Sequence, residues 1–249
     1  MIRIFLISLL LLITNLAQCQ VSDTLRVLFV GNSYTYFWNL PQTVEAMAVS
    51  ADFPLIARKS TAGGTNWRQH WEGEKGLKSR QLIEQGNWDI VVLQNHSRST
   101  LDSLDQFMEY GEKFINLVKS TGARPVLYET WAREHNPLTQ KDINEGYHAL
   151  AQKYNIEVVH IGELWHYALQ QRPGLRLYDP DQSHPSTIGT YLTASAFFTY
   201  FTGKRADGLP KRVSTTDRDG ELLYLSIMSE EDAEYLQMVV DTMRKEENE

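Results

Sequence analysis

Short apolar runs alternate with longer amphipathic stretches along most of this chain. The runs lie at residues 25–30, 90–93, 125–128 and 156–161, with a weaker one at 54–58. The first of them is apolar without alternation from Val27 to Val30, which is typical of a strand buried on both faces of a parallel sheet. The runs therefore predict strands, and Gly31 predicts a turn directly after the first one.

The stretches between the runs predict helices with recognisable ends. One begins near Pro41, and the others cover about 103–122, 139–154, 186–201 and 229–245. Thr139 with Asp142 predicts a capping box, and Ser186 and Ser229 are expected N-caps. Strand and helix in series predict an α/β fold with three αβα layers, in which helices cover both faces of a parallel sheet. No linker or repeat interrupts it, so we expect one domain over 21–249.

The first twenty residues have the pattern of an export signal. A basic Arg3 precedes an apolar stretch from Ile4 to Ile13, and small residues lie near Ala17. We expect a signal peptide at 1–20 and a protein that is periplasmic or secreted. Cys19, in "LAQC", resembles the lipid-attachment cysteine of a bacterial lipoprotein, although Gln18 stands where a small residue is usual. A lipid anchor at Cys19, as in an outer-membrane lipoprotein, is the alternative to ordinary cleavage.

Composition narrows the classes of partner. The formal charge is −7, and lysine and arginine are scattered along the chain, which argues against a nucleic-acid partner or a polybasic membrane surface. Cys19 is the only cysteine, so the mature domain cannot rely on disulfides or on a cysteine-ligated metal.

Residues suited to acyl transfer follow the predicted strands, where ligands collect in parallel sheets. Ser33 follows the first strand, and "DQSH" near the C-terminus offers Asp181 and His184. A serine becomes a good nucleophile when a base takes its proton and a carboxylate orients that base. These residues predict a Ser-His-Asp triad. A helix cap at Ser33 and a surface turn at 181–184 are the alternative interpretations.

An oxyanion needs hydrogen-bond donors that are fixed in advance. Gly63 and Gly64 follow the second strand, and no side chain would block approach to their backbone amides. Asn95, after the third strand, could add a side-chain donor, as could Gln94 or His96 beside it. A loop with paired glycines and a polar strand end are the alternatives.

In this order, "GNS", Gly64, Asn95 and "DQSH" resemble the four sequence blocks of the SGNH, or GDSL, hydrolase family. The resemblance extends from residue 25 to about 201 and implies a flavodoxin-like three-layer fold. It implies that Ser33 is the nucleophile, that His184 is the general base and then acid, and that Asp181 orients it. It further implies an oxyanion hole made by the backbone amides of Ser33 and Gly64 and the side chain of Asn95.

Two blocks depart from the family pattern. The usual G-D-S reads G-N-S, with Asn32 in place of an aspartate that is not a triad member. The third block, usually G-x-N-D, reads "LQNHS" and lacks its glycine, which affects the assignment of Asn95 and leaves Gln94 or His96 as substitutes.

Four tryptophans suggest a substrate. The stretches "GNSYTYFWNLP", "GGTNWRQHW" and "TWARE" are closer to a bacterial subgroup of SGNH-type proteins than to the lipases. The rings near the predicted catalytic edge, which could stack on sugars, are Trp38, Trp67, Trp71 and Trp131. We expect an exported serine esterase that acts on a small acyl ester or an acetylated polysaccharide, with core packing as the alternative role of each ring. A glycan-binding protein without catalytic activity is the alternative function.

Other chemistries are less favoured, and no cofactor or metal is expected. "HIGELWH" at 160–166 does not match a standard zinc helix and is interpreted as a strand end followed by a packed helix. Glu129, Glu134 and Asp181 could supply a carboxylate pair for glycoside cleavage, but 31 acidic residues would give such a pair by chance. "TAGGT" lacks the lysine of a phosphate-binding loop.

Overall fold

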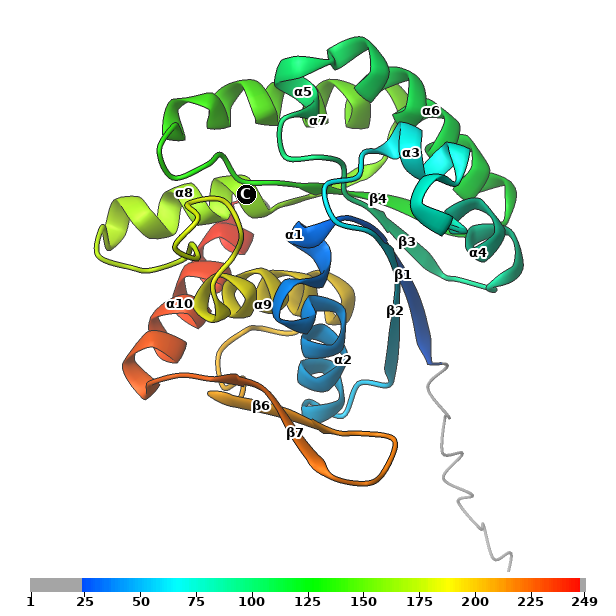
Figure 1. Ribbon diagram of the computed structural model, residues 1–249. Coiled ribbons are helices and arrows are strands. Elements are labelled where there is room, and N and C mark those ends of the chain that lie inside the picture. Colours follow the sequence, from blue (N-terminus) through cyan, green and yellow to red (C-terminus); the bar gives the residue numbers. More distant parts are fainter. Residues whose placement is uncertain (1–23, 247–249) are drawn as a thin grey trace, which may run out of the picture.

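The computed structural model describes residues 24–246 (Figure 1). The expected signal peptide and Cys19 lie outside these residues. Among the described residues, no helix is both long and apolar enough to cross a membrane.

A five-stranded parallel sheet forms the centre of the molecule. Its strands are β1 (Leu25–Gly31), β2 (Leu55–Thr61), β3 (Ile90–Leu93), β4 (Arg124–Glu129) and β5 (Glu157–His160). They lie in the order β2-β1-β3-β4-β5, which is the flavodoxin-like order, with a switch point between β1 and β3. The expected parallel sheet is confirmed, and every predicted apolar run overlaps one of its strands.

Two layers of helices cover the sheet (Figure 1). On one face lie α2 (Leu40–Ser50), α8 (Ile161–Gln171), α9 (Thr187–Thr202) and α10 (Glu230–Glu246). On the other lie α3 (Trp67–Glu72), α4 (Ser79–Gln85), α5 (Ser99–Asp102), α6 (Leu104–Ser120) and α7 (Gln140–Tyr154). The result is the three-layer αβα arrangement that the sequence predicted.

The strands are apolar without alternation because each contributes to two cores. In β1, Val27 and Phe29 belong to the core under α2, α8, α9 and α10, while Leu28 and Val30 belong to the core under the other layer. Side chains of neighbouring strand residues point to opposite faces. A parallel strand with helices on both sides therefore needs an apolar residue at every position.

The structure changes some local predictions. The Ser186 hydroxyl caps α9 as expected, because it accepts hydrogen bonds from the backbone N–H groups of Ile188 and Gly189, each at 3.1 Å. The capping box at Thr139 is wrong: its hydroxyl donates to the Asn136 carbonyl at 2.8 Å, and its side chain makes no capping bond to α7. An antiparallel hairpin of β6 (Arg212–Thr216) and β7 (Leu222–Ile227), which packs against the α2 side of the molecule, was not predicted.

Candidate active site

Ser33 stands at the carboxyl edge of the sheet because the chain turns sharply after β1. A Cβ atom on Gly31 would lie 2.3 Å from Thr35 Oγ1 and 2.4 Å from Gln94 Oε1, so this close packing requires glycine. Asn32, and not Ser33, caps the short helix α1 (Ser33–Tyr36), since Asn32 Oδ1 accepts the Tyr34 N–H at 3.0 Å. The hydroxyl of Ser33 is therefore not used for capping.

The loop before α9 brings the predicted acid and base to Ser33. His184 Nε2 lies 2.8 Å from Ser33 Oγ, and the Nδ1 atom of the same ring contacts Asp181 Oδ2. Asp181 Oδ1 also accepts the backbone N–H groups of Ser183 and His184, at 3.0 and 2.9 Å. Hydroxyl, imidazole and carboxylate thus form one hydrogen-bonded chain, in which the carboxylate fixes the tautomer that can accept the serine proton.

Asp181 stays a carboxylate although its loop is partly covered. Partial burial acts to raise its pKa, but the bonds from the His184 ring and from two backbone N–H groups outweigh burial and bring the pKa below its ordinary value. Nearby Asp179 shows the opposite shift: burial and then the charge of Asp181 raise its pKa. Asp181 is therefore the carboxylate whose environment favours the charged form.

Aromatic residues hold the loop that carries His184. The Phe37 ring stacks on the imidazole with centroids 4.1 Å apart, and the Tyr34 ring meets it edge-on at 5.7 Å. The Tyr34 hydroxyl shares a 2.7 Å hydrogen bond with Ser183 Oγ, and the Trp131 indole donates to the Ser183 carbonyl at 3.0 Å. Trp131 also stacks on Tyr34 with centroids 4.5 Å apart. These contacts limit rotation of the imidazole away from Ser33.

The candidate oxyanion donors lie on three neighbouring loops. Ser33 and Gly64 line one cleft. Gly64 has a backbone φ of +66°, which residues with a side chain rarely adopt. Asn95 is buried, and its Oδ1 accepts the N–H groups of Trp67 at 2.9 Å and His96 at 2.8 Å. Two donors on Oδ1 fix the orientation of the side-chain amide, so its Nδ2 N–H groups remain the donors for other partners.

The two substitutes for Asn95 differ in availability. Gln94 is committed to structure: its Oε1 accepts the Asn32 N–H at 2.8 Å and the Thr35 hydroxyl at 2.9 Å, and its Nε2 donates to the Asn95 carbonyl. His96, by contrast, lines the cleft beside Ser33. Burial and then the charge of Arg133 lower the pKa of His96, which favours a neutral ring.

The asparagine in "GNS" has a structural explanation. Asn32 Nδ2 donates to the Thr65 carbonyl at 3.0 Å and to the Asn95 carbonyl at 3.5 Å. An aspartate could donate neither bond and would place a charge against two carbonyl oxygens. Asn32 thus ties the loops after β1, β2 and β3 together, and the departure from G-D-S has a role in this chain.

The four tryptophans do not form one surface. Trp67 and Trp131 are 0% and 1% exposed, so neither ring has a face open to a sugar, and the expectation of substrate stacking is corrected to core packing for both. Trp71 is half-buried, meets Phe114 edge-on and lines a different pocket. Trp38 is 44% exposed, and its indole donates to the Pro185 carbonyl at 2.9 Å, next to His184. Of the four rings, Trp38 is the most exposed, and it lies against the loop that carries His184.

A cleft of about 350 Å³ opens beside Ser33 and His184. Its wall includes Arg133, which follows β4 in the "TWARE" stretch. Arg133 Nε is buried and has no hydrogen-bond partner among residues 24–246. The sequence pattern singles out Trp131 in this stretch, whereas the arginine two residues further on is the residue of the stretch that lines the cleft.

Comparison with known proteins places this geometry in a fold family. No family model matches the sequence, and no curated protein matches it either. Among solved structures, a DUF4886 family protein from Bacteroides uniformis has a TM-score of 0.73 at 16% identity, over 91% of this chain and 97% of its own. An acetyl xylan esterase has a TM-score of 0.58 at 16% identity, over 71% of this chain and 99% of its own.

A third similar structure identifies the fold. A member of the lipolytic G-D-S-L family from Veillonella parvula has a TM-score of 0.53 at 16% identity, over 72% of this chain and 98% of its own. The chain has the fold of the SGNH/GDSL hydrolases, as the sequence blocks implied. At these identities the likeness concerns the fold, and the chemistry has to be argued from the residues of this chain.

Proposed function

We propose that this protein is a serine esterase in which Ser33 attacks an acyl ester, His184 takes and returns the proton, and Asp181 orients His184. The observation that carries the proposal is the unbroken hydrogen-bonded chain from Ser33 Oγ through the imidazole to Asp181. Attack by Ser33 forms a tetrahedral oxyanion, the alcohol leaves with the proton from His184, and water then releases the acid by the same route. The N–H groups of Ser33 and Gly64 and the Nδ2 of Asn95 are the proposed oxyanion donors.

The proposed substrate is an acetyl ester on a carbohydrate, presented outside the cytoplasm. The acetyl xylan esterase among the structural neighbours supports this choice. The size of the cleft suits a small acyl group, and Trp38, the residue after Phe37 in the cleft wall, offers a partly exposed ring for a sugar. Export by the N-terminal segment at 1–20 is part of the same proposal.

Arg133 adds a charge preference to the proposal. A guanidinium whose Nε is buried without a partner is stabilised by an anionic group that enters the cleft. We therefore expect acetylated sugars that carry a carboxylate, as in pectin, to be better substrates than neutral ones such as acetylated xylan.

The test is acetate release by the mature protein from 4-nitrophenyl acetate, acetylated xylan and acetylated pectin. We expect release by the wild type and a loss on the order of 10⁶-fold in S33A. S120A, which removes a hydroxyl at the exposed end of α6, is the control and should keep full activity. Sugar binding without acetate release from any ester would instead favour the alternative of a glycan-binding protein.

A further inference from the structure

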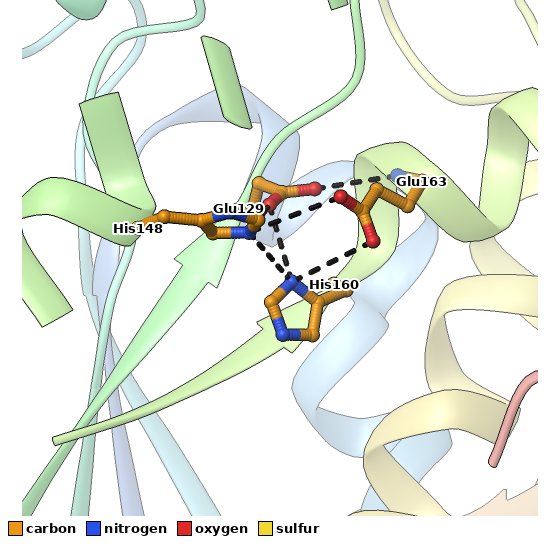
Figure 2. A group of neighbouring side chains, drawn as sticks. All are labelled: Glu129, His148, His160 and Glu163. Atoms are coloured by element: carbon orange, nitrogen blue, oxygen red, sulfur yellow. Dashed lines mark hydrogen bonds and ion pairs between the residues drawn. The ribbon is translucent and has the colours of Figure 1, made fainter. Parts of the chain in front are cut away.

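Two histidines and two glutamates converge at the ends of β4 and β5, whereas Ser33 follows β1. Glu129 and His160 are the last residues of the two strands and are paired in register, Glu163 lies in the first turn of α8, and His148 comes from α7. Figure 2 shows the four side chains pointing toward one another. One nitrogen or oxygen of each lies within 4.8 Å of the other three.

The spacing of these atoms fits a tetrahedral metal ion. Tetrahedral zinc has bonds of about 2.0–2.1 Å, which place neighbouring ligand atoms about 3.3 Å apart. His148 Nε2 and His160 Nδ1 are 3.2 Å apart, and they lie 3.2 and 3.3 Å from Glu129 Oε2. Glu163 lies farther away: its Oε1 is 3.8 Å from His148 Nε2, and its Oε2 is 3.9 Å from His160 Nδ1. Three of the six distances between ligand atoms thus have the tetrahedral length, and one oxygen of Glu163 has to move closer to both nitrogens to become the fourth ligand.

Charge and burial favour a cation among these groups. The Glu129 side chain is 0% exposed, and a buried carboxylate needs compensation by positive charge. A second carboxylate, that of Glu163, is within 4.8 Å of it. Two carboxylates and two neutral imidazoles around one divalent ion would give a net charge of zero.

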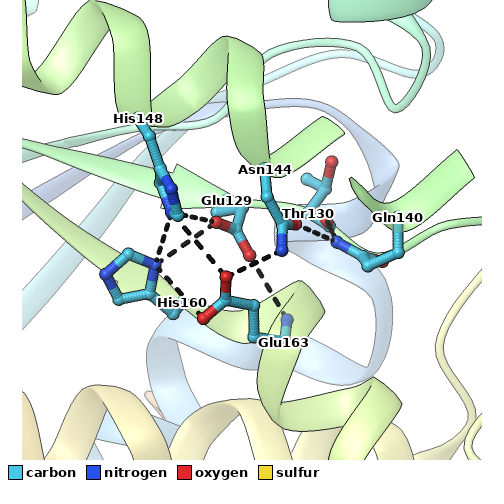
Figure 3. A network of polar contacts seen from close by, with 7 residues as sticks. All are labelled: Glu129, Thr130, Gln140, Asn144, His148, His160 and Glu163. Atoms are coloured by element: carbon cyan, nitrogen blue, oxygen red, sulfur yellow. Dashed lines mark hydrogen bonds and ion pairs between the residues drawn. The ribbon is translucent and has the colours of Figure 1, made fainter. Parts of the chain in front are cut away.

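Polar residues next to the cluster orient one of its members, Glu163 (Figure 3). Asn144 Nδ2 donates to Glu163 Oε1 at 2.8 Å, and Gln140 Nε2 donates to Asn144 Oδ1 at 2.6 Å and to the Thr130 carbonyl at 3.1 Å. Such bonds fix the direction of a metal ligand and are typical of built metal sites. They also connect the cluster to the segment after β4, which carries Trp131.

We propose that Glu129, His148, His160 and Glu163 form a site for a divalent transition-metal ion of the Zn²⁺ type. Two imidazole nitrogens favour Zn²⁺ over Ca²⁺ or Mg²⁺, which prefer six or more oxygen ligands. The side chains of His148 and Glu163 are 45% and 36% exposed, so an ion can reach the site from solvent. Sequence analysis overlooked the site because Glu129 and His148 are distant in sequence from the "HIGELWH" stretch that holds the other two ligands.

The test uses the mature protein without a histidine tag, stripped with a chelator and dialysed against Zn²⁺. We expect one Zn²⁺ per chain by elemental analysis, a higher melting temperature with Zn²⁺ than with Mg²⁺, and the strong visible bands of tetrahedral Co²⁺ after substitution. H148A should weaken Zn²⁺ binding by roughly 100-fold or more and N144A by about 10-fold.

The control is H166A, which removes an exposed histidine of α8 that lies outside the cluster. It should bind Zn²⁺ like the wild type. Because His148 is half exposed, H148A should fold, which circular dichroism checks. No stoichiometric Zn²⁺ in the wild type, or equal binding by the wild type and H148A, would overturn the proposal.

Discussion

The indole of Trp131 donates a hydrogen bond to the carbonyl of Ser183, the residue before His184, at 3.0 Å. This bond joins the segment after β4 to the loop that carries the proposed base. The same ring stacks on Trp165 with centroids 3.8 Å apart, so the loop is supported from the core of the molecule. The orientation of His184 therefore depends on a residue that does not touch the candidate nucleophile.

W131F tests this support. Phenylalanine keeps an aromatic ring in the stack but removes the donor, so we expect kcat to fall several-fold because His184 is held less firmly, with stability lowered by about 1–2 kcal/mol. W165F is the matched control, because it also keeps an aromatic ring in the stack with Trp131 and removes only an indole bond to Thr193 Oγ1, at 3.0 Å, that does not involve the loop. It should lower stability by a similar amount and leave kcat nearly unchanged. Equal effects of the two variants on kcat would contradict a positioning role for Trp131.

Asn95 and His96 compete as the third oxyanion donor. Because two backbone N–H groups hold Asn95 Oδ1, its Nδ2 is a fixed donor, and we expect N95A to lower kcat by about 10²–10³-fold. H96A should cost less than 10-fold. Kinetics with 4-nitrophenyl acetate, with thermal melts to confirm folding, separate the two. A larger loss in H96A would assign the role to His96.

Arg133 is expected to set the charge preference. R133Q should lower kcat/KM for acetylated, carboxylate-bearing sugars about 10-fold or more, as loss of a charge-assisted hydrogen bond does, and change neutral esters little. R98Q is the control, because Arg98 is already paired with Asp102 at 2.7 Å. Equal losses on charged and neutral substrates in R133Q would argue against a charge-recognition role.

The stability of the protein should depend on pH because of His70, which contacts the chain two residues before Ser33. His70 is buried, contacts the Gly31 carbonyl at 2.9 Å and Ser79 Oγ at 2.7 Å, and burial lowers its pKa to about 4. In the unfolded chain the His70 imidazole takes up a proton near pH 6.5, whereas in the folded protein it does so only near pH 4. The contribution of neutral His70 to the free energy of unfolding is therefore complete above about pH 6.5 and is lost as the pH falls toward 4. It is on the order of 3 kcal/mol.

Urea unfolding at several pH values between 4 and 7.5 measures this effect. The wild type should lose more free energy of unfolding over this range than H70N, which cannot titrate there. The same pH dependence in both proteins would show that other groups cause the loss. Because the comparison is between two proteins, the shared contribution of the carboxylates cancels.

The sequence predicted the sheet well because its strands are buried on both faces, so apolar runs such as 90–93 stand out from their surroundings. The proximity of Ser33, Asp181 and His184 was also predictable, because the ends of parallel strands share one edge of the sheet and 181–184 is a local turn. The β6–β7 hairpin was missed because Leu222, Leu223, Tyr224 and Ile227 are exposed and do not follow a two-faced pattern.

Properties that depend on packing between distant segments could not be read from the chain. The burial of Trp67 follows from its contact with Phe107, whose ring centroid lies 5.0 Å away, and nothing in "GGTNWRQHW" indicates that partner. The cluster around Glu129 likewise combines residues from two strands and two helices. Local patterns predict elements and sheet edges, whereas side-chain contacts between helices require the structure.

The most direct measurement is covalent labelling of the protein lacking residues 1–20 by a fluorophosphonate, which reacts with activated serines, followed by peptide mass spectrometry. The account predicts one adduct, on Ser33, that is absent in S33A and forms at least about 100-fold more slowly in H184A. An adduct on another serine, or labelling of H184A at the wild-type rate, would contradict the claim that His184 activates Ser33.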